Sequence, residues 1–204
     1  MKLKTSAFIV ILATVQAVHA QGFINLKFET TTISGGAATV PGWTWTTFYY
    51  SDTNLVPYNN ASLSAPAVNL EGTNSLFAPA IQGNYSILIQ GGDRFSFTTN
   101  GASIMQTAQI PVTGNSLTYW GGPLEVTFGG QAIFFNAISN APNFSVWQAD
   151  ISPYAGQIGT LVFHAPWKSE SLLDNIQFSS TAVPEPSAVV LAVLGVTLLI
   201  VRRR

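Results

Sequence analysis

The sequence predicts an all-β protein whose body is an antiparallel β-sandwich, with a jelly roll as the expected topology. Thr, Ser, Asn, Gly and aromatic residues are abundant through the middle of the chain. No long stretch there has the apolar periodicity of a helix, and short alternating apolar and polar segments recur between glycine-containing turns. Short strands that follow one another without intervening helices are typical of two packed antiparallel sheets.

The alternation is clearest in residues 85–89 and 124–128, where apolar side chains occupy every second position. This pattern is typical of a strand with one buried face. Gly129 and Gly130 follow the second segment and lead into residues 131–135. Two glycines supply the positive φ angles of a tight turn, so a hairpin is predicted here.

The amino end has the parts of a secretory signal peptide. Two lysines precede an apolar stretch from 7 to 15, and the Val-His-Ala triplet at 18–20 places small residues where a signal peptidase cuts. We therefore expect signal peptidase to remove residues 1–20, with Gln21 as the mature start. An amino-terminal membrane anchor is the alternative, but the apolar stretch is short for a span.

The body between the two ends has the length of a single domain, with the sandwich expected over residues 21–178 and a linker over 179–183. Residues 21–183 carry three basic and eight acidic side chains, a net charge of −5. Such a body lacks the basic surface that binds nucleic acid, so no nucleic-acid partner is expected. The chain has no cysteine, which excludes disulfides and thiolate metal sites.

The carboxyl end, residues 184–204, combines a proline-flanked acid, an apolar run and an arginine cluster. Its proline and charged residues are Pro184, Glu185, Pro186, Arg202, Arg203 and Arg204. As a helix, the uncharged run 187–201 would span roughly 22 Å. The hydrocarbon core of a bilayer is about 30 Å thick, so the run predicts a short transmembrane helix. The arginines favour a cytoplasmic carboxyl end.

This arrangement resembles the PEP-CTERM sorting signal of exported bacterial proteins, with all three parts in the expected order. The resemblance implies recognition by exosortase, a membrane cysteine peptidase, and cleavage near the Pro-Glu-Pro motif. The protein would then remain in the cell envelope or pass to the extracellular matrix. A plain carboxyl-terminal membrane anchor is the alternative.

The body resembles a second group, the galactose-binding-like jelly rolls of carbohydrate-binding modules. The matching motifs are Phe28-Glu29, Val40-Pro41-Gly42-Trp43, the run from Trp147 to Gln157 with Leu161-Val162-Phe163, and Leu173-Asp174-Asn175-Ile176. Residues between Trp43 and Asn84 depart from the pattern. In such modules a structural Ca²⁺ commonly joins an acid near the amino end to an Asp near the carboxyl end. The resemblance implies that Glu29 and Asp174 hold this ion.

The position of Asp174 in its predicted strand is informative independently of this resemblance. Alternation in residues 172–178 places its side chain on the apolar face, with Leu172, Ile176 and Phe178. A carboxylate buried there needs a partner. Two interpretations stay open, a hydrogen-bonded Asp that ties strand to loop and a calcium ligand. Oxygen ligation suits a cysteine-free exported protein.

Three aromatic residues, Trp43, Trp45 and Tyr49, fall on one face of a predicted strand. They are spaced to form a platform on which sugar rings could stack. The alternative places Trp43 and Trp45 in the core, because large aromatics dominate sandwich interiors.

Motifs of common enzyme classes are absent from the sequence, and His164 is the single histidine of the mature body. The sequence therefore predicts a non-enzymatic envelope or matrix protein, anchored by its carboxyl-terminal helix or released by processing. Its sandwich is expected to bind exopolysaccharide. A secreted carbohydrate-active enzyme, which would need two close carboxylates, and a purely structural matrix protein are the alternatives.

Overall fold

The computed structural model describes residues 22–47, 51–60, 65–92 and 101–183, with the backbone alone for 52–54. The predicted signal peptide, Tyr49 and the whole segment 184–204 lie outside these residues. Within the described ranges, no helix has both the length and the apolar character needed to cross a membrane.

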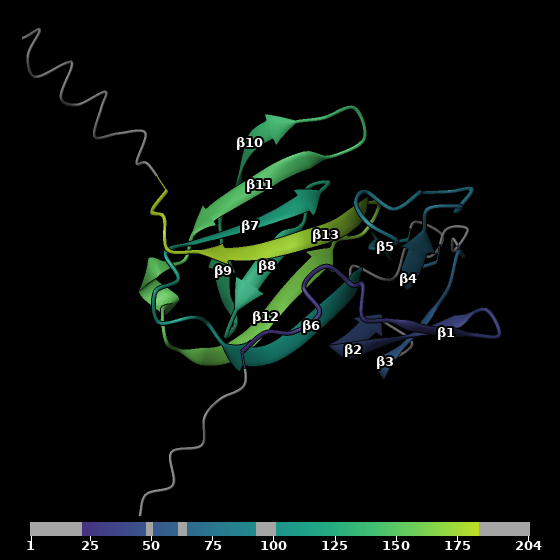
Figure 1. The fold of residues 1–204 in the computed structure, drawn as a ribbon, viewed down its shortest axis with the longest axis horizontal. Coiled ribbons are helices and arrows are strands. Elements are labelled where there is room, and N and C mark those ends of the chain that lie inside the picture. Colours follow the sequence, from purple (N-terminus) through teal and green to yellow (C-terminus); the bar gives the residue numbers. More distant parts are fainter. Residues whose placement is uncertain (1–21, 48–50, 61–64, 93–100, 184–204) are drawn as a thin grey trace, which may run out of the picture.

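These residues form two antiparallel sheets, which confirms the all-β sandwich (Figure 1). The first sheet has the order β1-β2-β6-β12-β8-β9, with β3 also paired to β2. Its strands are β1 (Thr32–Ser34), β2 (Ala37–Thr47), β3 (Ser51–Pro57), β6 (Ala102–Gln109), β8 (Glu125–Phe128), β9 (Gln131–Ile133) and β12 (Ile158–Ala165).

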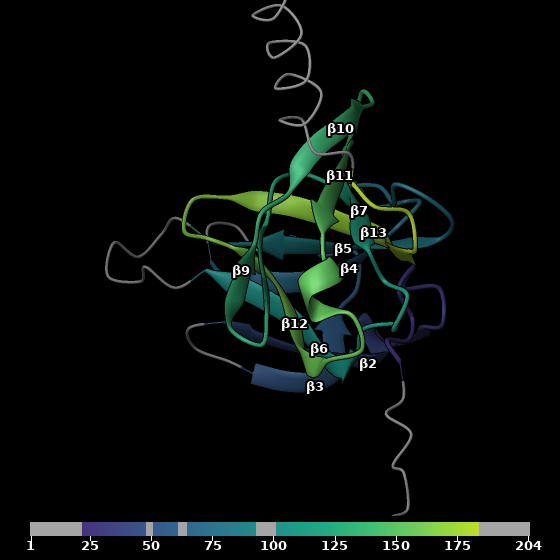
Figure 2. The same cartoon turned by 90° about the vertical axis from the view of Figure 1, so that its left-hand side faces the viewer.

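The second sheet has the order β10-β11-β7-β13-β5-β4. Its strands are β4 (Ala67–Gly72), β5 (Tyr85–Gln90), β7 (Ser116–Gly121), β10 (Asn136–Asn140), β11 (Ser145–Asp150) and β13 (Glu170–Ser179). A single 3₁₀ turn, η1 (Ser152–Tyr154), interrupts the strands of the described chain. In Figure 2, β13 and β7 lie above β12, β6 and β3, so the two sheets are seen as separate layers.

The chain passes repeatedly from one sheet to the other. It crosses after β3, β5, β6, β7, β9, β11 and β12. The last two strands enter the middle of the sheets, because β12 lies between β6 and β8 and β13 lies between β7 and β5. Residues far apart in the sequence are therefore neighbours throughout the fold.

The predicted hairpin is confirmed between β8 and β9, where Phe128 pairs with Gln131. Gly129 and Gly130 have φ angles of 56° and 81°, which is the left-handed region that glycine adopts without strain. The second strand ends at Ile133, earlier than the predicted residue 135. The chain then crosses to the other sheet and begins β10.

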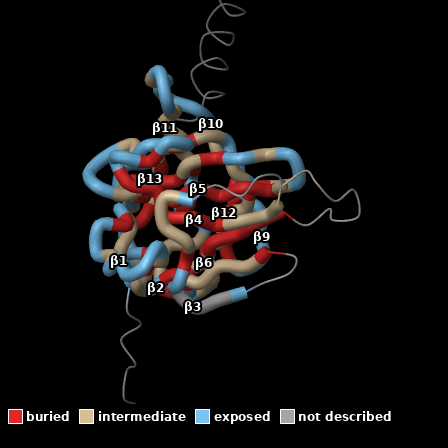
Figure 3. Tube along the Cα trace, turned by 90° about the vertical axis from the view of Figure 1, so that its right-hand side faces the viewer, coloured by how far each residue is buried: buried red, intermediate tan, exposed pale blue. Residues whose placement is uncertain are grey.

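The core lies between the two sheets, and Figure 3 shows buried segments along the central strands. Four large aromatic side chains, Phe28, Trp43, Tyr119 and Phe163, are fully buried in it. The ring centroids of Phe28 and Trp43 are 5.5 Å apart, and those of Tyr119 and Phe163 are also 5.5 Å apart. Aromatic pairs at this separation add to the free energy of burial, and the contact of Tyr119 on β7 with Phe163 on β12 joins the two sheets.

The predicted facing of Leu172 and Asp174 on β13 is wrong, because Leu173 is the residue whose side chain lies in the core. The register of β13 on β7 shifts between Asp174 and Gln177, and Asn175 has a φ of 47°. This β-bulge inserts a residue, so Leu173 and Ile176 both enter the core. Asp174 therefore does not share the core face with Ile176. It lies on the other side of the strand and is buried there, with 1% of its surface exposed.

Candidate functional site

Asp174 holds the turn that leads into β5. Its Oδ2 accepts a hydrogen bond from the backbone N–H of Gln82 at 3.1 Å and another from Ser86 Oγ at 2.8 Å. Its Oδ1 accepts one from the backbone N–H of Asn175 at 2.6 Å. This is the geometry of the first interpretation, an Asp that ties its strand to a loop.

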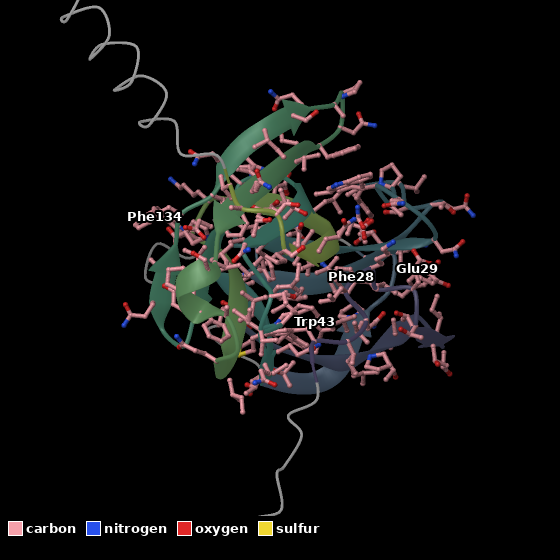
Figure 4. All side chains as sticks on the ribbon, turned by 60° about the vertical axis from the view of Figure 1, so that its left-hand side comes forward. Phe28, Glu29, Trp43 and Phe134 are labelled. Carbon is pink, nitrogen blue, oxygen red and sulfur yellow. The ribbon has the colours of Figure 1, made fainter. Side chains whose placement is uncertain are left out.

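Glu29 holds the same turn from the amino-terminal side of the chain (Figure 4). Its Oε1 accepts hydrogen bonds from the backbone N–H groups of Asn84 at 2.8 Å and Tyr85 at 3.3 Å. Its Oε2 accepts one from Asn84 Nδ2 at 3.0 Å. Gly83 lets the carboxylate approach, because a Cβ at that position would lie 2.2 Å from Glu29 Oε1.

The two carboxylates lie close enough to interact electrostatically. Burial raises the pKa of Asp174 from 3.8 to about 6, and the negative charge of Glu29 adds to the rise. Hydrogen bonds from Ser86, Asn175 and Gln82 act in the opposite direction. Because Asp174 is almost fully buried, a substrate could not reach its carboxyl group. The hydrogen bonds of both carboxylates fix the turn.

A calcium ion would meet a partly suitable set of groups here. One oxygen of each carboxylate already accepts two hydrogen bonds, whereas Glu29 Oε2 and Asp174 Oδ1 accept one each. The described residues contain no cluster of three or more side chains of the His, Cys, Asp or Glu type that could hold a metal. Ca²⁺ takes six to eight oxygens. Glu29 and Asp174 could supply two, and carbonyl groups or water would have to supply the rest.

Sequence reasoning missed a third acid, Glu71, which is fully buried on β4. It pairs in register with Ser86 of β5, so Ser86 has Glu71 on one neighbouring strand and Asp174 on the other. Ser75 Oγ donates a hydrogen bond to Glu71 Oε2, and Oε1 has no partner among the described residues. Burial raises the pKa of Glu71, and the Ser75 hydrogen bond partly offsets the rise. The β4–β5 connection is thus held near its start by buried Glu71 and near its end by buried Asp174 and exposed Glu29.

The predicted aromatic platform is replaced by its alternative. Trp43 is 1% exposed, and its Nε1 donates to the carbonyl oxygen of Asn25 at 3.2 Å. Trp45 pairs with the core residue Ile104, is partly buried against the core, and donates from Nε1 to the carbonyl oxygen of Leu55 at 2.7 Å. The two tryptophans do share a face of β2, but it is the inner one. A sugar could not stack on Trp43 in this fold.

His164 is a partly exposed residue of β12. Its Nδ1 lies 2.8 Å from Ser103 Oγ, and Glu125 faces it across the strand pair on its other side. No hydrogen bond or ion pair joins His164 to Glu125 in the described structure.

A surface pocket of about 360 Å³ opens at the edge of the sandwich where β9 leads into β10. It is lined by Ala132, Ile133, Phe134, Asn136, Gln148, Ala149, Asp150, Pro153, Tyr154 and Val183. Phe134 is 85% exposed, and Figure 4 shows it at the outside of the molecule, away from Trp43. Sequence reasoning missed this site. The available signal was the adjacent pair Phe134-Phe135, of which only one side chain can point inward in an extended chain.

Fold and geometry together define an antiparallel β-sandwich with a carboxylate-fastened loop at one place and an aromatic-rimmed pocket at another. No protein-family model matches the chain, and no curated protein matches it. A solved structure of a cyclase from Fischerella sp. TAU is similar, with a TM-score of 0.51 and 18% identity over 78% of this chain and 95% of that one. At this identity the likeness shows the fold alone.

A second solved structure is more distant. The K2 cleaved adhesin domain of Lys-gingipain (Kgp) is 12% identical, with a TM-score of 0.42, over 75% of this chain and 95% of that one. At that TM-score it supports no argument about this protein.

Proposed function

We propose that this chain is an exported, exosortase-sorted protein of the PEP-CTERM type that displays a jelly-roll sandwich in the cell envelope or extracellular matrix. Signal peptidase removes residues 1–20. The run 187–201 crosses the membrane as a short helix until exosortase acts near Pro184, Glu185 and Pro186. The sandwich, similar in type to galactose-binding-like modules, contacts exopolysaccharide and has no enzymatic role.

One observation carries the sorting part of the proposal. The last strand, β13, ends at Ser179, and Thr181 and Ala182 are exposed beyond it. The sandwich is therefore complete before the Pro-Glu-Pro motif begins. A membrane peptidase needs an accessible segment next to its cleavage site, and this position of the motif supports such access without any unfolding of the sheets.

Mass spectrometry of the protein from envelope and culture fractions tests the sorting. We expect the wild-type chain to lose its terminal residues near 184–186. The triple variant Pro184→Ala, Glu185→Ala, Pro186→Ala should retain Arg204. The matched control Thr181→Ala, which changes an exposed residue outside the motif, should be processed normally. A wild-type protein that ends at Arg204 in every fraction would contradict processing and favour a plain anchor.

A further inference from the structure

We propose that the pocket at the β9–β10 edge binds a segment of a neutral polysaccharide, with one sugar ring against Phe134. This inference rests on the proposed contact with exopolysaccharide and assigns it to a site other than the tryptophans of β2. The pocket volume of about 360 Å³ is at the lower end of the roughly 300–1,000 Å³ found for small-molecule sites. A pocket of this volume suits a short stretch of a polysaccharide rather than a large compact ligand.

Phe134 provides the apolar surface. Its side chain is 85% exposed beside the pocket, whereas the neighbouring Phe135 packs on buried Tyr119 with a centroid distance of 5.1 Å. The carbon–hydrogen face of a sugar ring packs well on an exposed aromatic ring. Tyr154, on η1, also lines the pocket and makes an edge contact with Phe128 at a centroid distance of 5.4 Å. The core residue Phe128 thus supports Tyr154, whereas Phe134 is open to solvent.

Two amide side chains provide hydrogen bonds. Asn136 of β10 and Gln148 of β11 are directly paired across the strands, so their side chains are on the same face. Neither side chain has a hydrogen-bond partner among the described residues. An amide offers both donors and an acceptor, which complements a hydroxyl group that also does both. Paired amides beside an aromatic ring are therefore suited to the alternating apolar and hydroxyl surfaces of a sugar.

The charge of the pocket selects the class of polysaccharide. No lysine or arginine is among its lining residues, and Asp150 contributes a carboxylate. Asp150 Oδ1 accepts a hydrogen bond from the backbone N–H of Ser152 at 2.8 Å, which fixes its side chain at the pocket. A fixed carboxylate accepts hydrogen bonds from sugar hydroxyls and repels uronic acids or sulfated sugars. A neutral polymer is the ligand that this lining favours.

Affinity electrophoresis of the full-length chain in mild detergent tests the assignment. The gels contain dextran, laminarin, galactomannan or, as the anionic probe, alginate. We expect at least one neutral polymer to retard the wild-type chain and alginate not to. Phe134→Ala should weaken that binding at least tenfold, and Gln148→Ala several-fold. Phe77→Ala is the matched control, because Phe77 is 59% exposed on the β4–β5 connection, away from the pocket.

The outcomes separate this inference from the proposed function. Retardation of the wild type that Phe134→Ala leaves unchanged would overturn the pocket while the polysaccharide contact stands. Retardation by alginate alone would overturn the neutral class of ligand. A wild-type chain that no polymer retards would overturn both the pocket assignment and the proposed contact. Equal melting temperatures of wild type, Phe134→Ala and Phe77→Ala establish that a loss of binding is not a loss of fold.

Discussion

Ser86 Oγ donates a hydrogen bond to Asp174 Oδ2 at 2.8 Å, across 88 residues of sequence. The same oxygen accepts the backbone N–H of Gln82, and Glu29 accepts the N–H groups of Asn84 and Tyr85, two of the three residues between Gln82 and Ser86. One turn is thus fixed by two carboxylates from opposite ends of the domain. The amino-terminal segment, β5 and β13 depend on each other through it.

Removal of the Asp174 carboxylate should destabilise this turn. Asp174→Ala leaves the Ser86 hydroxyl and the Asn175 N–H, both on buried residues, without their acceptor, and each such group costs about 1–3 kcal/mol. Ser86→Ala removes the donor to Asp174 and also the acceptor of the Ile81 backbone N–H, and it should cost about 1–3 kcal/mol. Urea unfolding measures both effects, and hydrogen exchange should show faster exchange at residues 82–86. Glu125→Ala, at an exposed position, is the control.

Stability should depend on pH through Asp174. Its pKa is raised by burial from 3.8 to about 6, so the folded state binds a proton more tightly than the unfolded state does. In metal-free protein the stability from this group is therefore fully present below about pH 4 and is lost as the pH rises through 6. A rise of this size corresponds to at most about 3 kcal/mol. Urea unfolding from pH 4 to 7 should give a flatter profile for Asp174→Asn, and parallel profiles would contradict the assignment.

If Glu29 and Asp174 are calcium ligands, calcium should restore at neutral pH the stability that is lost when Asp174 ionises. A cation relieves the mutual repulsion of the two carboxylates, and a ligand at one hundred times its Kd stabilises the fold by about 2.7 kcal/mol. Melting of the wild type should then shift upward in calcium and downward in EGTA. Glu29→Gln should abolish the shift, whereas Glu125→Gln should keep it. An unchanged melting temperature in EGTA would leave the hydrogen bonds as the whole explanation of the site.

Substitution of Trp43 should destabilise the fold more than substitution of Trp45, and neither ring should be needed for polysaccharide binding. Trp43→Ala opens a cavity beside Phe28 and Phe163 and should cost about 3–5 kcal/mol. Trp45→Ala removes a partly buried ring and its hydrogen bond to Leu55, with a smaller loss. Because both rings face inward, polysaccharide binding should survive in Trp45→Ala. Loss of binding in a folded Trp45→Ala protein would revive the platform hypothesis.

The fold class could be predicted from the sequence because alternation and glycine turns are local signals. Gly129 and Gly130, which form the β8–β9 turn, are adjacent in the sequence and can be recognised there. The side chains on each face were harder to predict. At Asn175 a single bulge reverses the alternation of β13, and the residues around Gly42, itself at a φ of 84°, shift the register of β2 on β3. A bulge depends on pairing with distant strands, so no local sequence pattern predicts it.

The candidate site, like the fold, could be predicted only in part from the sequence. Glu29 and Asp174 were expected to share one function, and the structure brings them to one turn. Glu71 was missed because its partner Ser75 comes from a connection that folds over the sheet. The pocket was missed because it joins β9, β11, η1 and Val183, which are distant in sequence. Composition predicts which chemical groups exist, whereas the crossings of the chain decide which of them meet.

The central position of β13 has a consequence for biogenesis. Until this strand is in place, the second sheet consists of two separate pieces, β10-β11-β7 and β5-β4. A chain that emerges from its amino end therefore cannot close the sandwich before nearly all of it has emerged. Under the proposed export, this delay keeps the polypeptide unfolded while it is translocated across the membrane. The domain would then fold at the stage when the sorting segment reaches the membrane. A chain whose sorting segment is recognised would therefore also be one whose last strand is available to complete the fold.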